Sequence, residues 1–424
     1  MLSDSSYIPK PVWAVGFGIF QILLLIVSTR QPISLLENAT DKKIIFLILF
    51  NMINNIFNID LFWFYNILMC VVDILLLCVI WFRPLLSFFW LVCLCVVGCG
   101  AAVLLGGGNL NLSAHGLAWH GSVFLVCAGT ILFFRNKKYG RRISLPILCF
   151  VIAFFVFCFS FWSLCIEPTW IEIVRYKYKT NLVTQPIRVA FFTDFQTDRI
   201  GDYERRALNL LREQNADLII LGGDYIQVND EEKELQLIKE FNALLKEVKL
   251  SAKFGVYALK GNQELVRWHD WKRSFIGTEI KTVERTRRIN VGELRVVLLS
   301  MWDSFSQRKI SSANYVLNKN SNQMPKQRFI LMAGHSPRYA LVGQDSHIVL
   351  AGHTHGGQVV IPFFGALINM TTGLPRHWSS GDHKLPNGSI LIVSKGVGLE
   401  RGHAPRIRFN CKPDFVIIDI VPEK

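Results

Sequence analysis

Two histidines that are two positions apart, His353 and His355, follow a short apolar run and lie in the sequence LAGHTHGGQ (Leu350–Gln358). The run 347–351 is apolar enough for a buried strand that ends at Gly352. If the backbone stays extended, the two imidazoles project from one side of it. Neutral imidazole is the commonest transition-metal ligand in proteins, so the pair suggests a metal site. A surface loop that happens to carry two histidines is the alternative.

Polar residues also follow four other predicted strands. Asp194 and Gln196 follow 187–193, Asp224 follows 218–221, Asn262, Gln263 and Glu264 follow 255–260, and His335 follows 329–333. A single Asp or Asn after a strand can be an ordinary turn residue. Five such strand ends in succession are hard to explain as turns. Mixed carboxylate, amide and imidazole ligands suit divalent ions such as Mn, Fe or Zn.

These strands belong to a segment of alternating strands and amphipathic helices that begins near Pro168. Apolar periodicity predicts helices over 203–215 and 232–248 and further strands over 294–300, 390–394 and 415–420. The alternation indicates an α/β domain, in which functional residues gather at the carboxyl ends of strands. We expect a linker over 167–185 and this domain over 186–424.

The order of these motifs resembles that of the calcineurin-like metallophosphoesterases, whose pattern is D-x-H, G-D, G-N-H-[DE], a single His and G-H-x-H. The resemblance covers roughly Pro186 to Ile420, and the residues 356–358 and 408–411 look like the membrane-anchored or exported bacterial branch. It implies a four-layer α/β/β/α sandwich with a two-metal centre and hydrolysis of a phosphoester.

The resemblance also implies roles for the residues. Asp194 and His355 would bind the first metal, with Gln196 as a weaker ligand, Asp224 would bridge, and Asn262, His335 and His353 would bind the second. A hydroxide shared by the two ions would attack phosphorus. Asn262, Gln263 and Glu264 would form the catalytic loop, in which Glu264 would orient one of the two amides.

Two positions depart from the family pattern. Gln196 stands where the family has a histidine, and its carbonyl oxygen ligates a divalent ion more weakly than imidazole does. Gln263 stands where the family has the histidine that helps to protonate the leaving group, and an amide cannot supply a proton. General acid catalysis contributes about 10²–10⁴-fold, so its loss matters most for poor leaving groups. The substitution therefore favours a diester or pyrophosphate over an alkyl monoester.

The first 166 residues are predominantly apolar, which argues against one globular domain. Apolar runs occur at 12–28, 44–57, 61–82, 85–105, 117–134 and 145–166. Most approach the ~20 residues that a membrane-spanning helix needs, so we expect six spans, or five because the second run is short and carries three asparagines. No cleavable signal peptide is apparent. For Asp73, inside the third run, we expect a hydrogen bond between helices rather than a functional carboxylate.

The basic residues predict the orientation of these spans. With six spans, the loops that contain Arg30, Lys42 and Lys43, then Arg83, then Arg135–Arg142 lie on one side, which the positive-inside rule places in the cytoplasm. The α/β domain would then be on the extracytoplasmic side of the plasma (inner) membrane. The net charge of +14 comes without a basic helix or an aromatic-interleaved basic patch. We therefore expect the cluster 281–288 to contact anionic head groups or an anionic lipid substrate rather than nucleic acid. The alternative is that this cluster is a solvated loop.

The sequence therefore predicts a multi-span helical membrane domain followed by a metal-dependent phosphohydrolase domain. We expect its substrate to be a phospholipid or a lipid-linked phosphate. One alternative is a pyrophosphatase of a nucleotide-linked lipid precursor, which would require a cytoplasmic active site. The other is a catalytically weakened phosphoesterase that serves as a membrane scaffold, which Gln196 and Gln263 would support. The oligomeric state stays open.

Overall fold

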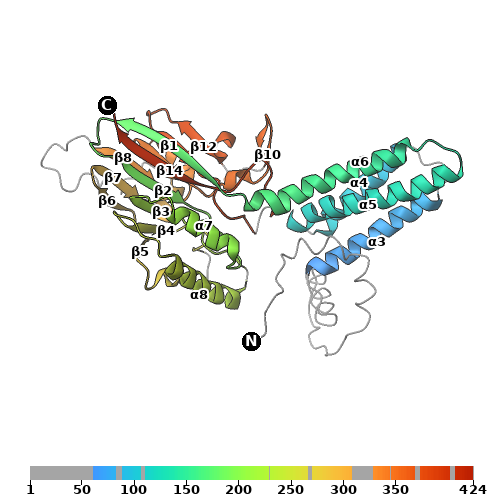
Figure 1. The fold of residues 1–424 in the computed structure, drawn as a ribbon, viewed down its shortest axis with the longest axis horizontal. Helices are drawn as coiled ribbons and strands as arrows, with labels where there is room; N and C mark the ends of the chain where they lie inside the picture. Colours follow the sequence, from blue (N-terminus) through green and yellow to red (C-terminus); the bar gives the residue numbers. More distant parts are fainter. Residues whose placement is uncertain are drawn as a thin grey trace. The chain divides into compact units, whose positions relative to one another are not determined.

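The computed structural model describes residues 61–82, 88–106, 110–228, 230–265, 270–307, 328–343, 345–367, 373–401 and 406–423. The chain divides into two compact units, Met1–Cys165 and Ile166–Lys424, which are considered one at a time (Figure 1).

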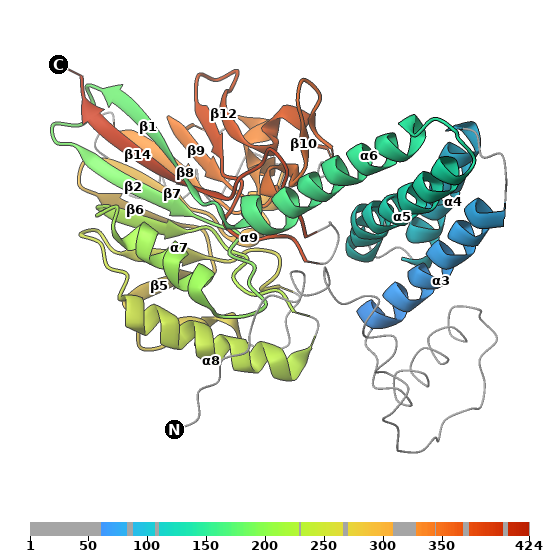
Figure 2. The same ribbon diagram turned by 45° about the vertical axis from the view of Figure 1, so that its right-hand side comes forward.

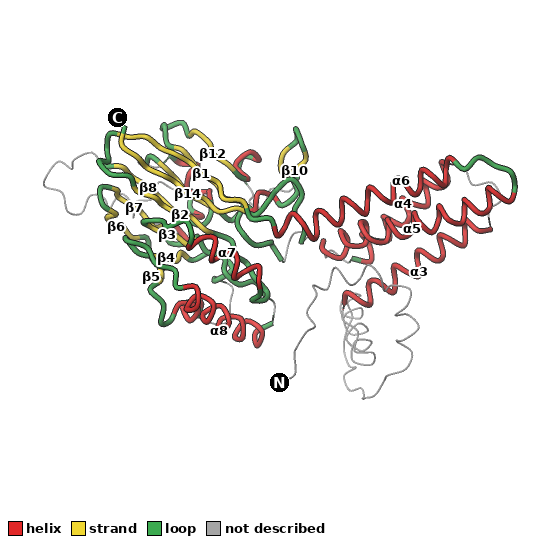
Figure 3. The backbone as a smooth tube through the Cα atoms, viewed as in Figure 1, coloured by secondary structure: helices red, strands yellow, loops and turns green. Residues whose placement is uncertain are grey.

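The described part of the first unit contains four long apolar helices, drawn in red in Figure 3. They are α3 (Leu61–Phe82), α4 (Phe88–Leu105), α5 (Leu110–Lys138) and α6 (Ser144–Phe161), and α6 continues through a π-helical turn and a 3₁₀ turn to Thr169. All four are long and apolar enough to cross a bilayer, and they coincide with the last four predicted spans. The predicted spans at 12–28 and 44–57 lie outside the described residues. These helices indicate a multi-pass membrane protein.

A polar cluster joins α3 to α5 inside this unit. His120 Nδ1 lies 2.8 Å from Asp73 Oδ2, and His120 Nε2 lies 3.1 Å from Asn66 Oδ1. Both Asp73 and His120 are buried. The helices approach closely here, because a Cβ atom on Gly116 of α5 would collide with the Tyr65 hydroxyl of α3. The expected hydrogen bond of Asp73 to another helix is therefore present.

The second unit contains two six-stranded sheets (Figure 2). The first sheet has the order β1 (Glu172–Thr180), β14 (Asp414–Pro422), β2 (Ile187–Phe192), β3 (Leu218–Leu221), β4 (Val256–Leu259) and β5 (Ile280–Val283). The second has the order β12 (Gly381–Lys384), β13 (Ile390–Val393), β9 (Ile348–Ala351), β8 (Phe329–Ala333), β7 (Leu294–Leu298) and β6 (Arg287–Val291).

The sheets pack face to face, and helical elements cover their outer faces. Side chains of both sheets, including Phe191, Ile220, Leu331 and Leu350, form one buried core between them. The amphipathic helices α7 (Asp202–Arg212) and α8 (Glu231–Val248) pack on the outer face of the first sheet. The short 3₁₀ turns η5 (Pro337–Val342) and η7 (Arg376–Ser379) pack on the outer face of the second. The domain is therefore the expected α/β sandwich, with an outer layer of short turns on one side.

The segment expected to be a linker contains a strand. β1 pairs in parallel with β14 over nine residues, from Glu172 opposite Asp414 to Thr180 opposite Pro422. Its sequence, EIVRYKYKT, alternates basic and apolar residues, which suits an edge strand that resists pairing with other chains. The expectation of a linker was therefore wrong over Glu172–Thr180, because an edge strand has too few apolar residues to be recognised.

Candidate metal centre

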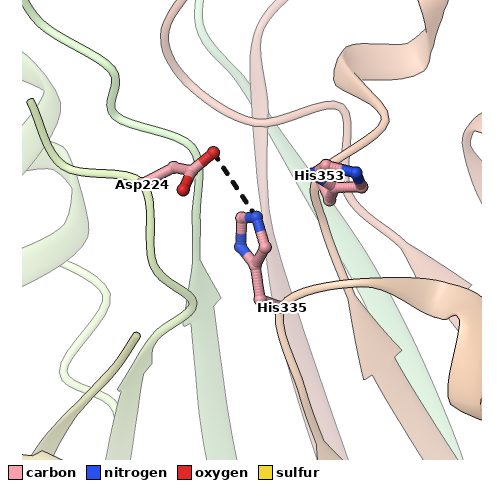
Figure 4. A group of neighbouring side chains, drawn as sticks. All are labelled: Asp224, His335 and His353. Atoms are coloured by element: carbon pink, nitrogen blue, oxygen red, sulfur yellow. Dashed lines mark ion pairs between the residues drawn. The ribbon is translucent and has the colours of Figure 1, made fainter. Parts of the chain in front are cut away.

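Strands of both sheets end at one place. β2, β3 and β4 deliver Asp194, Asp224 and Asn262, and β8 and β9 deliver His335 and His353. The side chains of Asp224, His335 and His353 offer ligand atoms that lie within 4.8 Å of one another. Figure 4 shows the Asp224 carboxylate and the His335 ring facing each other, with His353 beside them. This group could hold a metal ion.

The backbone at these strand ends turns through left-handed conformations. The φ angles are 53° at Asp194, 35° at Gln196, 58° at Asp224, 70° at His353 and 49° at His355. Such angles are costly for residues other than glycine and cluster at functional sites. The backbone is therefore not extended through His353 and His355, so the condition under which both imidazoles would project from one side is not met. His353 joins Asp224 and His335, while His355 Nε2 lies 3.8 Å from Asp194 Oδ1.

His335 is fixed through one ring nitrogen. Its Nδ1 lies 2.9 Å from the carbonyl oxygen of Gly222, which leaves Nε2 facing Asn262 Oδ1 at 3.0 Å and Asp224 Oδ2 at 3.4 Å. Burial acts to lower the pKa of His335, but the adjacent Asp224 carboxylate raises this pKa to about 10. A backbone carbonyl on the second nitrogen is how metal-binding histidines are commonly oriented.

Four buried ligand atoms have no hydrogen-bond partner among the described residues. They are Asp194 Oδ1, Gln196 Oε1 and both ring nitrogens of His355. Burial raises the pKa of Asp194 to about 7, although His335 opposes this shift, and burial also lowers the pKa of His355 to about 4. Burial and the neighbouring His335 lower the pKa of His353 to about 3. Unpaired buried polar atoms are costly, and this mixture of oxygen and neutral imidazole donors fits divalent metal ions.

Glu264 holds the backbone of two loops together. Its carboxylate accepts hydrogen bonds from the backbone N–H groups of Asp224 (2.9 Å), Tyr225 (2.8 Å) and Gly261 (2.8 Å). The backbone N–H of Gln263 in turn donates to Asp224 Oδ1 at 2.8 Å. These bonds fix backbone, and the role of Glu264 in orienting the side chain of Asn262 or Gln263 stays a prediction. Burial and the charge of Asp224 raise the pKa of Glu264 to about 7.

Gln196 is held by two carboxylates. Its Nε2 donates to Asp224 Oδ2 and to Glu400 Oε2, each at 3.2 Å. Gln227 Nε2 donates to the other oxygen of Glu400 at 2.8 Å, and Gln227 Oε1 accepts from the backbone N–H of Arg401 at 2.8 Å. Sequence patterns do not indicate Glu400 and Gln227, because neither lies in a motif and 173 residues separate them.

The loop after β13 packs against the Asp194 loop. The backbone N–H of Gly398 donates to the carbonyl oxygen of Asp194 at 2.6 Å, and a Cβ on Gly398 would lie 2.1 Å from the carbonyl oxygen of Phe195. The fully buried Arg408 donates to the carbonyl oxygens of Lys395, Gly396 and Gly398. Arg408 therefore fixes this loop, a role that the sequence did not indicate.

Two other histidines in the described part of the chain, His377 and His383, are not members of this group. His377 and His383 pack against each other with ring centroids 5.3 Å apart, and both contact Trp378. His269 and His403, the latter considered as a residue of the substrate cleft, lie outside the described residues.

Comparisons with known proteins find similar sequences and structures. The family model described as calcineurin-like phosphoesterase matches residues 187–357, which include all the predicted metal ligands. An uncharacterized metallophosphoesterase, YkuE, of Bacillus subtilis is 26% identical over 269 residues, covering 60% of this chain and 87% of that protein. Phosphodiesterase YaeI of Escherichia coli is 24% identical over 272 residues, covering 62% and 93%. The crystal structure of a dimetal phosphatase from Danio rerio covers 50% of this chain and 88% of that one at 13% identity, with a TM-score of 0.30.

Proposed function

We infer the function from one premise, which is that this chain carries a calcineurin-like metallophosphoesterase domain. From that premise, we propose that the protein hydrolyses a phosphodiester or pyrophosphate bond of a lipid or lipid-linked substrate. The family is one of metal-dependent phosphoesterases that use two metal ions. The observation that carries the proposal is a group of buried ligand atoms that have no hydrogen-bond partner among the described residues, beside the cluster of Asp224, His335 and His353. These atoms are Asp194 Oδ1, Gln196 Oε1 and both ring nitrogens of His355.

The residues divide into two groups around Asp224. In this proposal Asp194, Gln196 and His355 hold the first ion, Asn262, His335 and His353 hold the second, and Asp224 serves both. When bound, the two ions supply an activated water and neutralise the phosphoryl oxygens. The Gly222 carbonyl fixes the ring of His335, and Glu264 fixes the backbone of Asp224, so both ligands are oriented before an ion arrives.

The leaving-group side of the site has an amide instead of an acid. The backbone of Gln263 is fixed against Asp224 Oδ1, and its side chain can donate a hydrogen bond but cannot give up a proton. A substrate whose leaving group is stable as an anion, such as an activated diester or a pyrophosphate, does not need that proton. This supports a diester or pyrophosphate over an alkyl monoester.

The membrane helices support a substrate at the bilayer surface. Four apolar helices precede the catalytic domain, and the last candidate span ends at Thr169, three residues before β1 begins. A tether of this length keeps the domain close to the bilayer and raises the local concentration of membrane-borne substrates.

The first test is Mn²⁺-dependent hydrolysis of bis-p-nitrophenyl phosphate by the detergent-purified full chain, with Asp224→Asn beside it. We expect metal-dependent activity in the wild type and its loss in the variant. A protein that neither binds metal nor hydrolyses the ester would contradict the proposal and favour a scaffold role. Bound metal without activity on this ester would indicate a narrower substrate.

A pyrophosphatase of a nucleotide-linked lipid precursor is the second candidate, favoured by the missing acid at Gln263. Its substrate requires a cytoplasmic active site, whereas the basic loops favour the extracytoplasmic side. A topology reporter fused after Lys424 distinguishes the two candidates.

A further inference from the structure

An apolar hairpin protrudes from the catalytic domain directly after the candidate metal ligands. It consists of β10 (Val360–Ile361) and β11 (Gly365–Ala366), which pair only with each other. Its large apolar side chains face solvent. Phe363 is fully exposed, and the exposed fractions are 40% for Ile361, 56% for Phe364 and 48% for Leu367. We call residues 360–367 the apolar hairpin.

The tip of the apolar hairpin holds a phenylalanine in a conformation that glycine usually adopts. Phe364 N–H donates to the Ile361 carbonyl oxygen at 3.1 Å, which closes a four-residue turn with Pro362 and Phe363 at its centre. Phe363 has φ 65°. At this position turns normally carry glycine or asparagine, because a bulky side chain is strained there. The chain therefore accepts backbone strain at a residue whose aromatic ring is fully exposed.

The base of the apolar hairpin is bonded to the segment that meets the end of the last membrane span. Val360 N–H donates to the Phe409 carbonyl oxygen at 2.9 Å. Two residues further on, the backbone N–H of Cys411 donates to the carboxylate of Glu167, which lies within the candidate span Ser144–Thr169. The chain from residue 409 to residue 412 spans about 10 Å at most, so the two hydrogen bonds at Phe409 and Cys411 lie near each other. The base of the hairpin is therefore close to the residues at which the candidate span ends.

Two aromatic side chains in this region carry a cation on their rings. The Lys412 ammonium lies 4.1 Å from the ring centroid of Trp170, and the Arg376 guanidinium lies 4.5 Å from that of Phe364. Trp170 follows the span by one residue and is 49% exposed. Aromatic rings beside Lys or Arg are typical of the membrane interface, where the ring meets the acyl boundary and the cation meets lipid phosphates.

We propose that the apolar hairpin inserts its tip into the interface of the bilayer that the helices span, with Arg376 at the level of the phospholipid head groups. Insertion provides an apolar environment for Phe363 and Phe364. Because Gln358 and His355 immediately precede the hairpin, it also holds the metal centre toward the head groups. This inference deepens the proposed function and rests on it for the membrane-borne substrate, but it does not depend on the metal centre being active.

The test places a photoreactive benzoyl-phenylalanine at Phe363 of the full chain in nanodiscs of phosphatidylcholine and phosphatidylglycerol. After irradiation, we expect mass spectrometry to find a phospholipid joined to residue 363. The matched control carries the same group at Ile276, which is also an exposed apolar residue (63%) but lies just before β5, at the edge of the first sheet opposite β1. There we expect no lipid adduct.

A second variant protects the test against a misfolded hairpin. Phe363→Gly suits the left-handed turn and removes the ring. With the photoreactive group at position 364, we expect the lipid adduct to be lost or strongly reduced when residue 363 is Gly, compared with the chain in which residue 363 is Phe. The inference is overturned if position 363 gives no lipid adduct, if Ile276 gives an equal one, or if position 363 joins a second copy of the chain instead. Hydrolysis of soluble bis-p-nitrophenyl phosphate by the wild type reports on the proposed function alone, so the two can fail separately.

Discussion

A glutamine amide has one end that donates and one end that accepts, and its neighbours decide which end faces a metal. At Gln196 both Asp224 and Glu400 accept from Nε2. Ionised carboxylates cannot donate, so they can engage only this end of the amide. The acceptor end, Oε1, is therefore the buried atom without a partner. In the proposed metal centre Glu400 would thus orient Gln196 toward an ion, and Gln227 donates a hydrogen bond to Glu400.

The substitution Glu400→Gln tests this arrangement. One amide oxygen would have to accept from both Gln196 and Gln227, and the new NH₂ group would face other donors. Since groups that orient metal ligands contribute about 10–100-fold in metal affinity, we expect a loss of that order. Isothermal titration with Mn²⁺ and metal analysis of the detergent-purified chain measure it.

The control is the double variant Glu400→Gln with Gln227→Glu, which exchanges amide and carboxylate and keeps the total charge. The carboxylate at 227 can accept from the Arg401 backbone and from the new amide, whose oxygen accepts from Gln196. We expect metal affinity to recover. If the double variant binds metal as weakly as Glu400→Gln alone, Glu400 acts through its own charge on the metal rather than through Gln196.

Restoring an acid at position 263 changes which substrates are hydrolysed. Gln263→His would provide a group that can protonate a poor leaving group, a contribution of about 10²–10⁴-fold in enzymes that have it. We expect hydrolysis of a methyl p-nitrophenyl diester to change little and that of an alkyl phosphate monoester to rise at least about tenfold. Equal changes with both esters would show that leaving-group protonation is not what Gln263 limits.

At the scale of elements, loops that follow strands of opposite sheets pack tightly against each other. The loop after β13 lies on the loop after β2, with Gly398 against the Phe195 carbonyl and Arg408 beneath it. Phe195 lies between Asp194 and Gln196, so any displacement of this contact moves two candidate ligands together.

We expect Gly398→Ala to push the two loops apart, because its Cβ would lie 2.1 Å from the Phe195 carbonyl oxygen. Overpacking of this kind costs about 1–3 kcal/mol and should also weaken metal binding. Thermal unfolding and metal content of the full chain measure both effects. Gly201→Ala is the matched control, since its Cβ meets nothing closer than 3.6 Å. If the two variants behave alike, the contact is not tight.

Strands β8 and β9 are joined by a histidine that must be neutral. His347 Nδ1 accepts from the backbone N–H of Ile330 at 3.0 Å, and burial lowers the pKa of His347 from 6.5. A lowered pKa means that its contribution to stability is complete above pH 6.5 and is lost as the pH falls through the folded-state value. We expect acidification below pH 6.5 to lower the melting temperature more in the wild type than in His347→Asn, which accepts the same hydrogen bond without titrating. Parallel melting curves across pH would contradict this.

At the scale of the whole molecule, the chain combines a membrane unit and a catalytic unit that are stabilised in different ways. The catalytic unit has a large apolar core between its sheets. The membrane unit has apolar surfaces that face lipid, so burial from water adds little between its helices. Close contacts such as Gly116 with Tyr65, and the Asp73–His120 hydrogen bond, provide the specificity of its packing.

We expect Asp73→Leu to destabilise the membrane unit, because His120 then loses its carboxylate partner in an apolar environment. Hydrogen bonds between membrane helices contribute about 0.6 kcal/mol on average, up to about 1.7. The double variant Asp73→Leu with His120→Leu should be less destabilised than the sum of the single variants in thermal unfolding of the detergent-solubilised chain. Strict additivity would mean that the two side chains do not stabilise each other.

The sequence by itself determined the features that depend on local patterns. Apolar runs long enough to cross a bilayer marked α3 to α6, and short apolar strands marked the positions of Asp194, Asp224, Asn262, His335 and His353. Both are local because a span must satisfy its own backbone in lipid, and a strand end is marked by the residues that turn the chain. The order of these residues resembles that of the calcineurin-like metallophosphoesterases, and this resemblance implies a two-metal centre.

Only the tertiary structure decided which distant groups meet. Glu400 and Arg408 follow β13, and the pairing of β13 with β9 brings their loop to Asp194. Asp73 finds His120 because α3 packs on α5, and the polar edge strand β1 is recognisable only beside β14. The left-handed turns at His353 and His355 are costly locally and persist because surrounding contacts enforce them. These features depend on contacts between residues far apart in the chain, which no local pattern encodes.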